Sequence, residues 1–150
     1  MVAAFDRSLM LSSKYEARMT EERLCYWTRM YNDSVRIAAM SHPDLVRASG
    51  KFRIAAKIIP DRLQAWRNTG FTLYSIGEID EAISSFEFVT QFAQSDTATL
   101  NALGILYLGE SRDEEAIVQF EKALVHSEQL VTLTNLAVAL SRVGDIAASE

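Results

Sequence analysis

The strongest constraint on how this chain can fold is a 34-residue period within it. Shifting the sequence by one period places small residues on small residues and aromatic residues on aromatic residues. The matched pairs are Gly70 with Gly104, Glu81 with Glu115, Ala82 with Ala116, Ile83 with Ile117, Phe86 with Phe120 and Glu87 with Glu121. Self-similarity at such a period indicates a stack of repeated units, each of which buries its apolar face against its neighbours.

Partial copies extend the period in both directions. Asn135 returns 67 positions after Asn68, which is one period of 34 and one of 33, and Ala48, Phe52 and Ala55 repeat the spacing of a second repeat helix upstream. We predict an N-terminal helical arm or divergent capping helix at 1–42 and a repeat array at 43–150, divided into 43–62, 63–96, 97–129 and a truncated unit at 130–150. The last unit contains only the start of a second helix, so we expect self-association or an added partner to cover Leu136 and Leu140.

Each unit reads as two antiparallel helices, because apolar residues recur at spacings of three and four. The predicted ranges are 64–76, 80–93, 98–109 and 113–126. Gly77 is expected in the left-handed region after the first helix, and Asp80 or Asp113 is expected to accept from the free amides of the next. Gly70 and Gly104 are expected where paired helices approach closely.

The unit resembles the tetratricopeptide repeat, whose pattern is W-x2-L-G-x2-Y, then A-x3-F, then P. The matching residues are Trp66, Gly70, Ala82 and Phe86, then Gly104, Tyr107, Ala116, Phe120 and Ala123. The departures are Thr69, Leu100, Gln94 and Glu128. The resemblance covers residues 43 to 150 and implies an all-α fold, a right-handed α-solenoid of helix-turn-helix repeats.

The N-terminal region has a weaker pattern. Residues 20–40 carry Leu24, Trp27, Tyr31 and Val35 on one helical face. This is expected to be a divergent first helix that packs against a helix from Pro43 to Lys57, or alternatively a dimerisation or partner-binding helix. Residues 1–19 are expected to form a further short helix or a mobile lead. Cys25 is predicted to be a small core residue.

Reactive groups do not converge in the sequence. It contains no glycine-rich phosphate loop, no metal-ligand spacing and no Gly-x-Ser-x-Gly elbow. His42 and His126 lie far apart in the sequence, near predicted helix ends, and are predicted to be surface or capping residues. We therefore expect no enzyme activity, no cofactor and no metal.

The charge pattern argues against nucleic acid as a partner. The net charge is −5, with a basic excess in residues 1–62 and an acidic excess in residues 63–150, whereas nucleic-acid surfaces are basic. Apolar runs are interrupted by charges before the roughly 18 residues that a membrane span needs. The first residues lack the pattern of a secretory signal, and the single cysteine fits a reducing compartment. These features predict a cytoplasmic protein with no membrane span.

In the tetratricopeptide family the first helix of each unit lines the concave surface. Carried over by position, this implies a partner-binding groove formed by Gln64, Arg67, Asn68, Phe71, Tyr74, Asn101, Ile105, Leu108, Asn135, Val138 and Arg142, with Ala98, Thr134 and Ser141 beside them. Its amides could grip the backbone of an extended peptide, and Phe71 and Leu108 are the expected apolar anchors. The basic clamp with which related proteins hold the carboxylate end of chaperone tails is missing.

Two functions follow from this reading. The first is a non-catalytic adaptor or scaffold that binds a protein or peptide partner within a larger assembly. The alternative is a small dedicated chaperone, similar to the tetratricopeptide chaperones of bacterial secretion systems, that keeps a client protein soluble. A competing interaction site is the basic arm around Arg18, Arg23 and Arg29.

Overall fold

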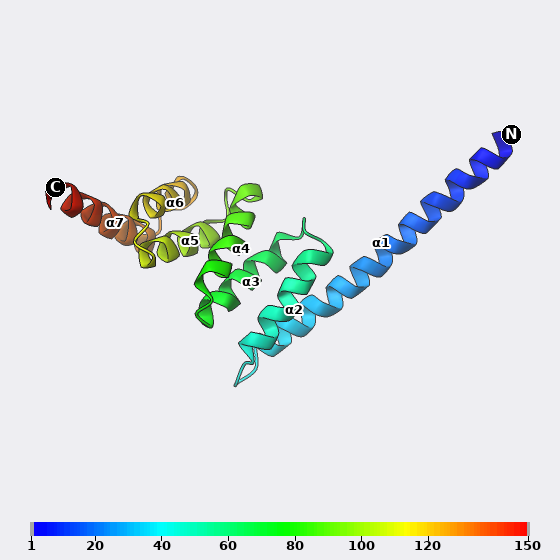
Figure 1. The fold of residues 1–150 in the computed structure, drawn as a ribbon, viewed down its shortest axis with the longest axis horizontal. Coiled ribbons are helices and arrows are strands. Elements are labelled where there is room, and N and C mark those ends of the chain that lie inside the picture. Colours follow the sequence, from blue (N-terminus) through cyan, green and yellow to red (C-terminus); the bar gives the residue numbers. More distant parts are fainter. Residues whose placement is uncertain (1, 150) are drawn as a thin grey trace.

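A computed structural model describes residues 2–149 of the chain, and the side chains of residues 10–144. Within that range the chain forms helices and no strand (Figure 1), arranged as an all-α helical-repeat solenoid. The helices are α1 (Val2–Ala38), α2 (Leu45–Ile58), α3 (Leu63–Ser75), α4 (Ile79–Phe92), α5 (Thr97–Gly109), α6 (Asp113–His126) and α7 (Leu130–Ser149). Each helix packs on the next one along the chain, and α7 also touches α5.

The helix pairs α3–α4 and α5–α6 begin and end within about a turn of the predicted positions. The turn between α3 and α4 contains Gly77 at φ +82°, which confirms the predicted left-handed glycine. One period later Ser111 adopts φ +59° at the corresponding place between α5 and α6. The backbone geometry of this turn is therefore retained even where a serine replaces the glycine.

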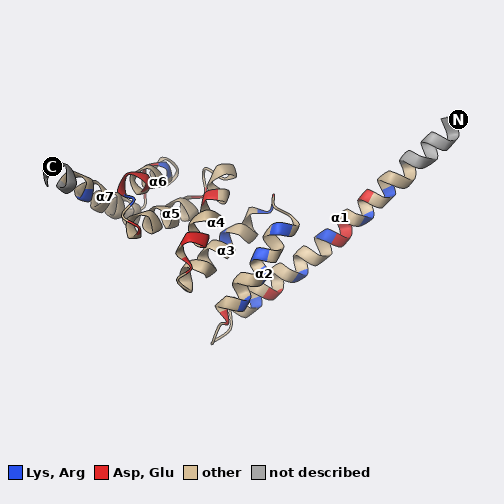
Figure 2. Ribbon diagram, viewed as in Figure 1, with Lys and Arg blue, Asp and Glu red and all other residues tan. Residues whose placement is uncertain are grey.

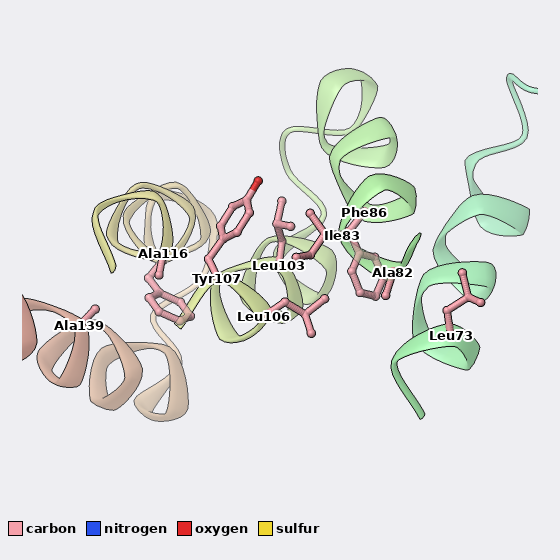
Figure 3. Close-up of a cluster of buried hydrophobic side chains, with 10 residues drawn as sticks. Leu73, Ala82, Ile83, Phe86, Leu103, Leu106, Tyr107, Ala116 and Ala139 are labelled. Carbon is pink, nitrogen blue, oxygen red and sulfur yellow. The ribbon is translucent and has the colours of Figure 1, made fainter. Parts of the chain in front are cut away.

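The crossing of the two helices in each pair depends on a glycine facing a phenylalanine. A Cβ added to Gly70 would lie 2.5 Å from the ring of Phe86, and one added to Gly104 would lie 2.5 Å from the ring of Phe120. Both rings are fully buried in one cluster that runs from α3 to α7 (Figure 3). The predicted close approach at Gly70 and Gly104 is confirmed.

The helix caps differ from the prediction. Asp80 and Asp113 lie inside the first turns of α4 and α6, whose N-cap residues make no side-chain cap bond, so the predicted caps are wrong. Side-chain caps occur instead at Asp44, which accepts from the amide of Arg47 at 2.9 Å, and at Asp96. Because Asp44 precedes α2, that helix begins at Leu45 rather than at Pro43.

The N-terminal helix α1 is one helix of 37 residues, so the separate helix or lead expected before residue 20 is wrong. Its first part projects away from the other helices (Figure 1), and only its later part packs on α2. The buried side chains there are Trp27, Met30, Ser34 and Ile37.

The buried face of α1 is rotated relative to the predicted face. Leu24 and Val35 are exposed and Tyr31 is half-buried, whereas Met30 and Ile37 were missed. Cys25 is exposed, so its prediction as a core residue is wrong. It lies on the side of α1 opposite the residues that face α2.

Helix α7 runs from Leu130 to Ser149 without a break at Gly144, where the period predicts a turn. Continuing the helix keeps backbone hydrogen bonds that a turn would lose. Among the described residues, no helix combines the length and the apolar character that crossing a membrane requires. Figure 2 shows acidic residues on α4 and α6, basic residues along α2, and residues of both charges along α1.

Candidate interaction surface

The residues predicted to bind a partner lie on the first helices of successive pairs, α3, α5 and α7. We call the side chains that these helices leave open the first-helix surface, and it consists of Gln64, Phe71, Tyr74, Ile105, Leu108 and Val138. Phe71, Ile105 and Val138 occupy the same position in successive periods, and all three are exposed. Leu108 is half-buried against the core, while Gln64 and Tyr74 are exposed. The period therefore places an apolar group at the same point of each first helix.

An apolar hollow of about 370 Å³ lies at the N-terminal end of this surface, between α1 and α3. We call it the α1–α3 hollow, and it is lined by Val35, Ala38, Ala39, Phe52, Asn68, Phe71, Thr72 and Ser75. The sequence prediction included Phe71 and Asn68 but missed the α1 residues. No sequence signal indicated them, because the amphipathic pattern placed Val35 on the face predicted to pack, whereas it is exposed.

The amides of the surface are partly engaged within the protein. Asn68 donates from Nδ2 to the Tyr31 hydroxyl at 3.1 Å, which ties α3 to α1. Asn101 is half-buried, and its Oδ1 has no hydrogen-bond partner among the described residues. Asn135 is half-buried on α7. The Asn101 Oδ1 atom is closed to solvent, so a ligand would reach it only after the Asn101 side chain turned outward.

Both arginines predicted for the groove have partners in the protein. Arg67 pairs with Asp96 at 3.4 Å. Arg142 lies 3.2 Å from the buried carboxylate of Asp113 and donates to the backbone oxygen of Leu108 at 3.0 Å. Arg142 therefore joins α7 to the end of α5 and the start of α6. The sequence prediction, which named Arg142 only as a groove residue, did not include this structural role.

Polar groups elsewhere in the described chain also have structural surroundings. The Tyr107 hydroxyl donates to Glu87 at 2.6 Å, and burial together with this carboxylate raises the pKa of Tyr107. No cluster of three or more His, Cys, Asp or Glu side chains suited to a metal occurs among the residues described. His42 and His126 are exposed, as predicted.

The chain matches no protein-family model and no curated protein. Solved structures do match its fold. The first TPR domain of Spaghetti (RPAP3), bound to the HSP90 peptide SRMEEVD, superposes with a TM-score of 0.71 at 12% identity, over 79% of this chain and 93% of that one. MamA from Desulfovibrio magneticus RS-1 gives 0.70 at 24% identity, over 79% and 67% of the two chains.

The TPR domain of Sgt2 from Aspergillus fumigatus gives a TM-score of 0.68 at 15% identity, over 81% of this chain and 82% of that one. At these identities the likeness concerns the fold. It agrees with the 34-residue period and with the glycine–phenylalanine crossings of the two complete helix pairs.

Proposed function

Because the chain folds as a tetratricopeptide-repeat solenoid, we propose that it is a non-catalytic adaptor or scaffold that binds an extended, mainly apolar peptide segment of a partner protein. The observation that carries the proposal is the α1–α3 hollow, which opens beside Phe71 on the first-helix surface. A cytoplasmic location and binding to a protein or peptide partner, with no nucleic acid, belong to the same proposal.

The size and lining of the hollow favour an apolar side chain as its occupant. Recognition sites for peptides combine a few apolar anchors with polar groups that fix orientation. Val35, Ala38 and Phe71 supply the apolar walls, and Thr72 and Ser75 line the same space. One leucine, isoleucine or phenylalanine side chain of the ligand would be removed from water when it enters the hollow.

The remaining apolar groups extend the site along the solenoid. Ile105 and Val138 follow Phe71 at intervals of 34 and 33 residues, each on the next first helix. A ligand with apolar side chains at intervals along an extended backbone fits this arrangement.

Charge disfavours an acidic ligand. The peptide SRMEEVD in the Spaghetti structure carries several carboxylates. Here the two arginines of the predicted groove are committed to Asp96 and Asp113. Using either for a ligand would break an existing ion pair, and at Asp113 it would leave a buried carboxylate without its partner.

The experiment is selection of short random peptides displayed on phage against the full chain, followed by affinity measurement on synthetic peptides. We expect selected sequences rich in Leu, Ile, Phe and Met and poor in Asp and Glu. Changing Phe71 to Ala and Leu108 to Ser together should weaken binding at least tenfold, since removal of an interface anchor costs about 2 kcal/mol. Selection of acidic sequences would contradict the proposal.

A control double variant removes exposed apolar side chains from the second helices. Val46 on α2 and Val125 on α6 are both strongly exposed, and changing them to Ala and Ser should leave peptide affinity unchanged. Circular dichroism should show the same helix content for both double variants. Equal losses in the two would mean that the first-helix surface is not the site.

Two further outcomes separate this function from its competitors. A dedicated chaperone would co-purify with one stoichiometric client that is insoluble alone, whereas an adaptor remains soluble and well folded without a partner. If charge reversal at Arg18, Arg23 and Arg29 abolishes binding while the Phe71 and Leu108 changes do not, the arm is the site. Arg18 already pairs with Glu22, and Arg23 donates to the Ile58 backbone oxygen.

A further inference from the structure

One face of α7 is left open where the equivalent faces of α3 and α5 are covered. Leu133 and Leu140 are 47% and 52% exposed, whereas Leu100 and Tyr107, at the same positions one period earlier, are 1% and 4% exposed. In the complete pairs Gly70 and Gly104, on the same side of the first helix, pack against the second helix of the same unit. No described residue takes that place beside α7.

The open face has a regular alternation of large and small residues. Leu133, Ala137, Leu140 and Gly144 follow at steps of four, three and four, which places them along one side of the helix. Ala137 and Gly144 are exposed, and a Cβ added at Gly144 would meet nothing within 4 Å. We call these four residues the α7 seam.

We propose that the α7 seam is a dimer interface, on which a second copy of this chain places its own α7 in antiparallel orientation. A two-fold axis midway between Val138 and Ala139 brings Leu133 of one copy opposite Gly144 of the other, and Leu140 opposite Ala137. By symmetry, both leucines of each copy then lie opposite a small residue of the other copy. Such complementarity lets the helices approach to the short end of the usual 8–10 Å and cover the leucines.

The charge of α7 permits this contact despite the acidic C-terminal half of the chain. Between Leu130 and Gly144 the sole ionisable residue is Arg142. Arg142 is directed to Asp113 within its own copy. Two seams can therefore meet without like charges facing each other.

A helix of the kind found in the complete pairs fits the seam less well. In those pairs a phenylalanine ring occupies the space that a Cβ on Gly70 or Gly104 would need. Ala137 stands at the equivalent place on α7 and carries that Cβ. A phenylalanine ring placed against α7 as Phe120 is placed against α5 would collide with the Cβ of Ala137. A leucine side chain beside Ala137 does not need to insert as far toward the α7 backbone.

The register can be tested by disulfide cross-linking in the full chain, with Cys25 changed to Ser. Ala137→Cys and Leu140→Cys proteins, mixed and oxidised, should form a cross-linked heterodimer, because the proposed axis brings these positions together within disulfide range. Each protein alone should cross-link at least tenfold less. Equal cross-linking of either protein alone would overturn the antiparallel register.

The affinity can be tested by sedimentation equilibrium. Changing Leu133 and Leu140 to Ser should raise the dimer dissociation constant at least tenfold. Changing Val125 and Val131 to Ser removes exposed apolar surface off the seam and should leave it unchanged. If the parent chain, with unaltered helix content, stays monomeric at high concentration, the proposal is wrong and the face belongs to a different helix.

This interface is independent of the proposed peptide site. Phe71 and Leu108 lie outside the seam, so their double variant should bind peptide weakly and still dimerise. The serine variant of the seam should be monomeric and still bind peptide. A single variant that loses both properties without losing helix content would show that one of the two surfaces has been misplaced.

Discussion

Helices α3 to α6 and the first part of α1 have the same secondary structure, but only α3 to α6 are covered by neighbouring helices. Every helix from α3 to α6 has 13 or 14 residues and ends at a turn or short loop, and its apolar face is buried against a neighbour. In α1, all residues from 10 to 26 are exposed, and the helix continues for 37 residues.

This difference shows what limits a helix in this protein. In the middle of the array, left-handed residues at Gly77 and Ser111 end one helix and direct the chain back onto it. The first part of α1 has no glycine or proline, so nothing in its local sequence interrupts the helix. Packing therefore stabilises the middle helices, whereas local propensity alone maintains the arm.

The largest effect is expected at a crossing in the middle of the array. Ala116 is fully buried in α6 beside the Phe120 contact. Changing Ala116 to Phe should overpack the crossing and lower the free energy of unfolding by about 1–3 kcal/mol, measured by chemical denaturation.

The control for this change lies on the same helix. Val118 is exposed, so Val118→Phe should change the free energy of unfolding by less than about 0.5 kcal/mol. An unchanged denaturation midpoint for Ala116→Phe would mean that α5 and α6 do not cross as described.

A smaller effect is expected at the turn that ends α3. Gly77 is left-handed, and a Cβ there would meet no atom within 4 Å, so Gly77→Ala should destabilise through backbone conformation alone, by about 1 kcal/mol. Gly109 also has open space but lies at the end of α5 without a positive φ. Gly109→Ala should therefore stabilise slightly, and equal destabilisation by both changes would contradict this account.

The sequence predicted the middle of the array well because its signals recur. Gly70 and Gly104 recur one period apart, and each faces a phenylalanine. This recurrence distinguished glycines that are required for helix packing from glycines without such a role. The turn at Gly77 followed from the same logic. The period also placed Phe71, Ile105 and Val138 on equivalent points of successive helices, where all three are exposed.

The sequence failed where no second copy exists for comparison. The rotation of α1 could not be fixed from one amphipathic stretch, which is why Met30 and Ile37 were missed and Cys25 was misplaced. The α1–α3 hollow depends on that rotation. The pair between Arg142 and Asp113 joins residues in different helices, and no local spacing indicates it.

The pH dependence of stability tests the contact between Asp33 of α1 and Lys51 of α2, in the part of α1 that packs on α2. Lys51 of α2 donates to Asp33 at 2.8 Å, and this hydrogen bond lowers the pKa of Asp33 below its usual value of 3.8. A lowered pKa in the folded state means that the contribution to stability is present above the unfolded pKa and is lost as pH falls through the folded pKa.

Asp33→Asn should therefore lower the denaturation midpoint slightly near neutral pH, and the difference from the parent should shrink as the pH falls below about 4. Because both partners are partly exposed, the effect should weaken in high salt. A difference that stays constant from neutral pH to pH 2 would exclude the ion pair as its cause.

The smallest effect is expected from deleting residues 1–19, which contain the first half of α1. Residues 10–26 are exposed on all sides, and the first buried side chain of α1 is Trp27. Deleting residues 1–19 should therefore leave no cavity and change the free energy of unfolding of the array by less than about 0.5 kcal/mol, while the circular dichroism signal falls in proportion to the helix removed. The measurement belongs at low protein concentration, where contacts between copies are rare. A loss of more than about 1 kcal/mol would mean that the arm folds back onto the array, and the contrast between a covered middle and an uncovered arm would then be wrong.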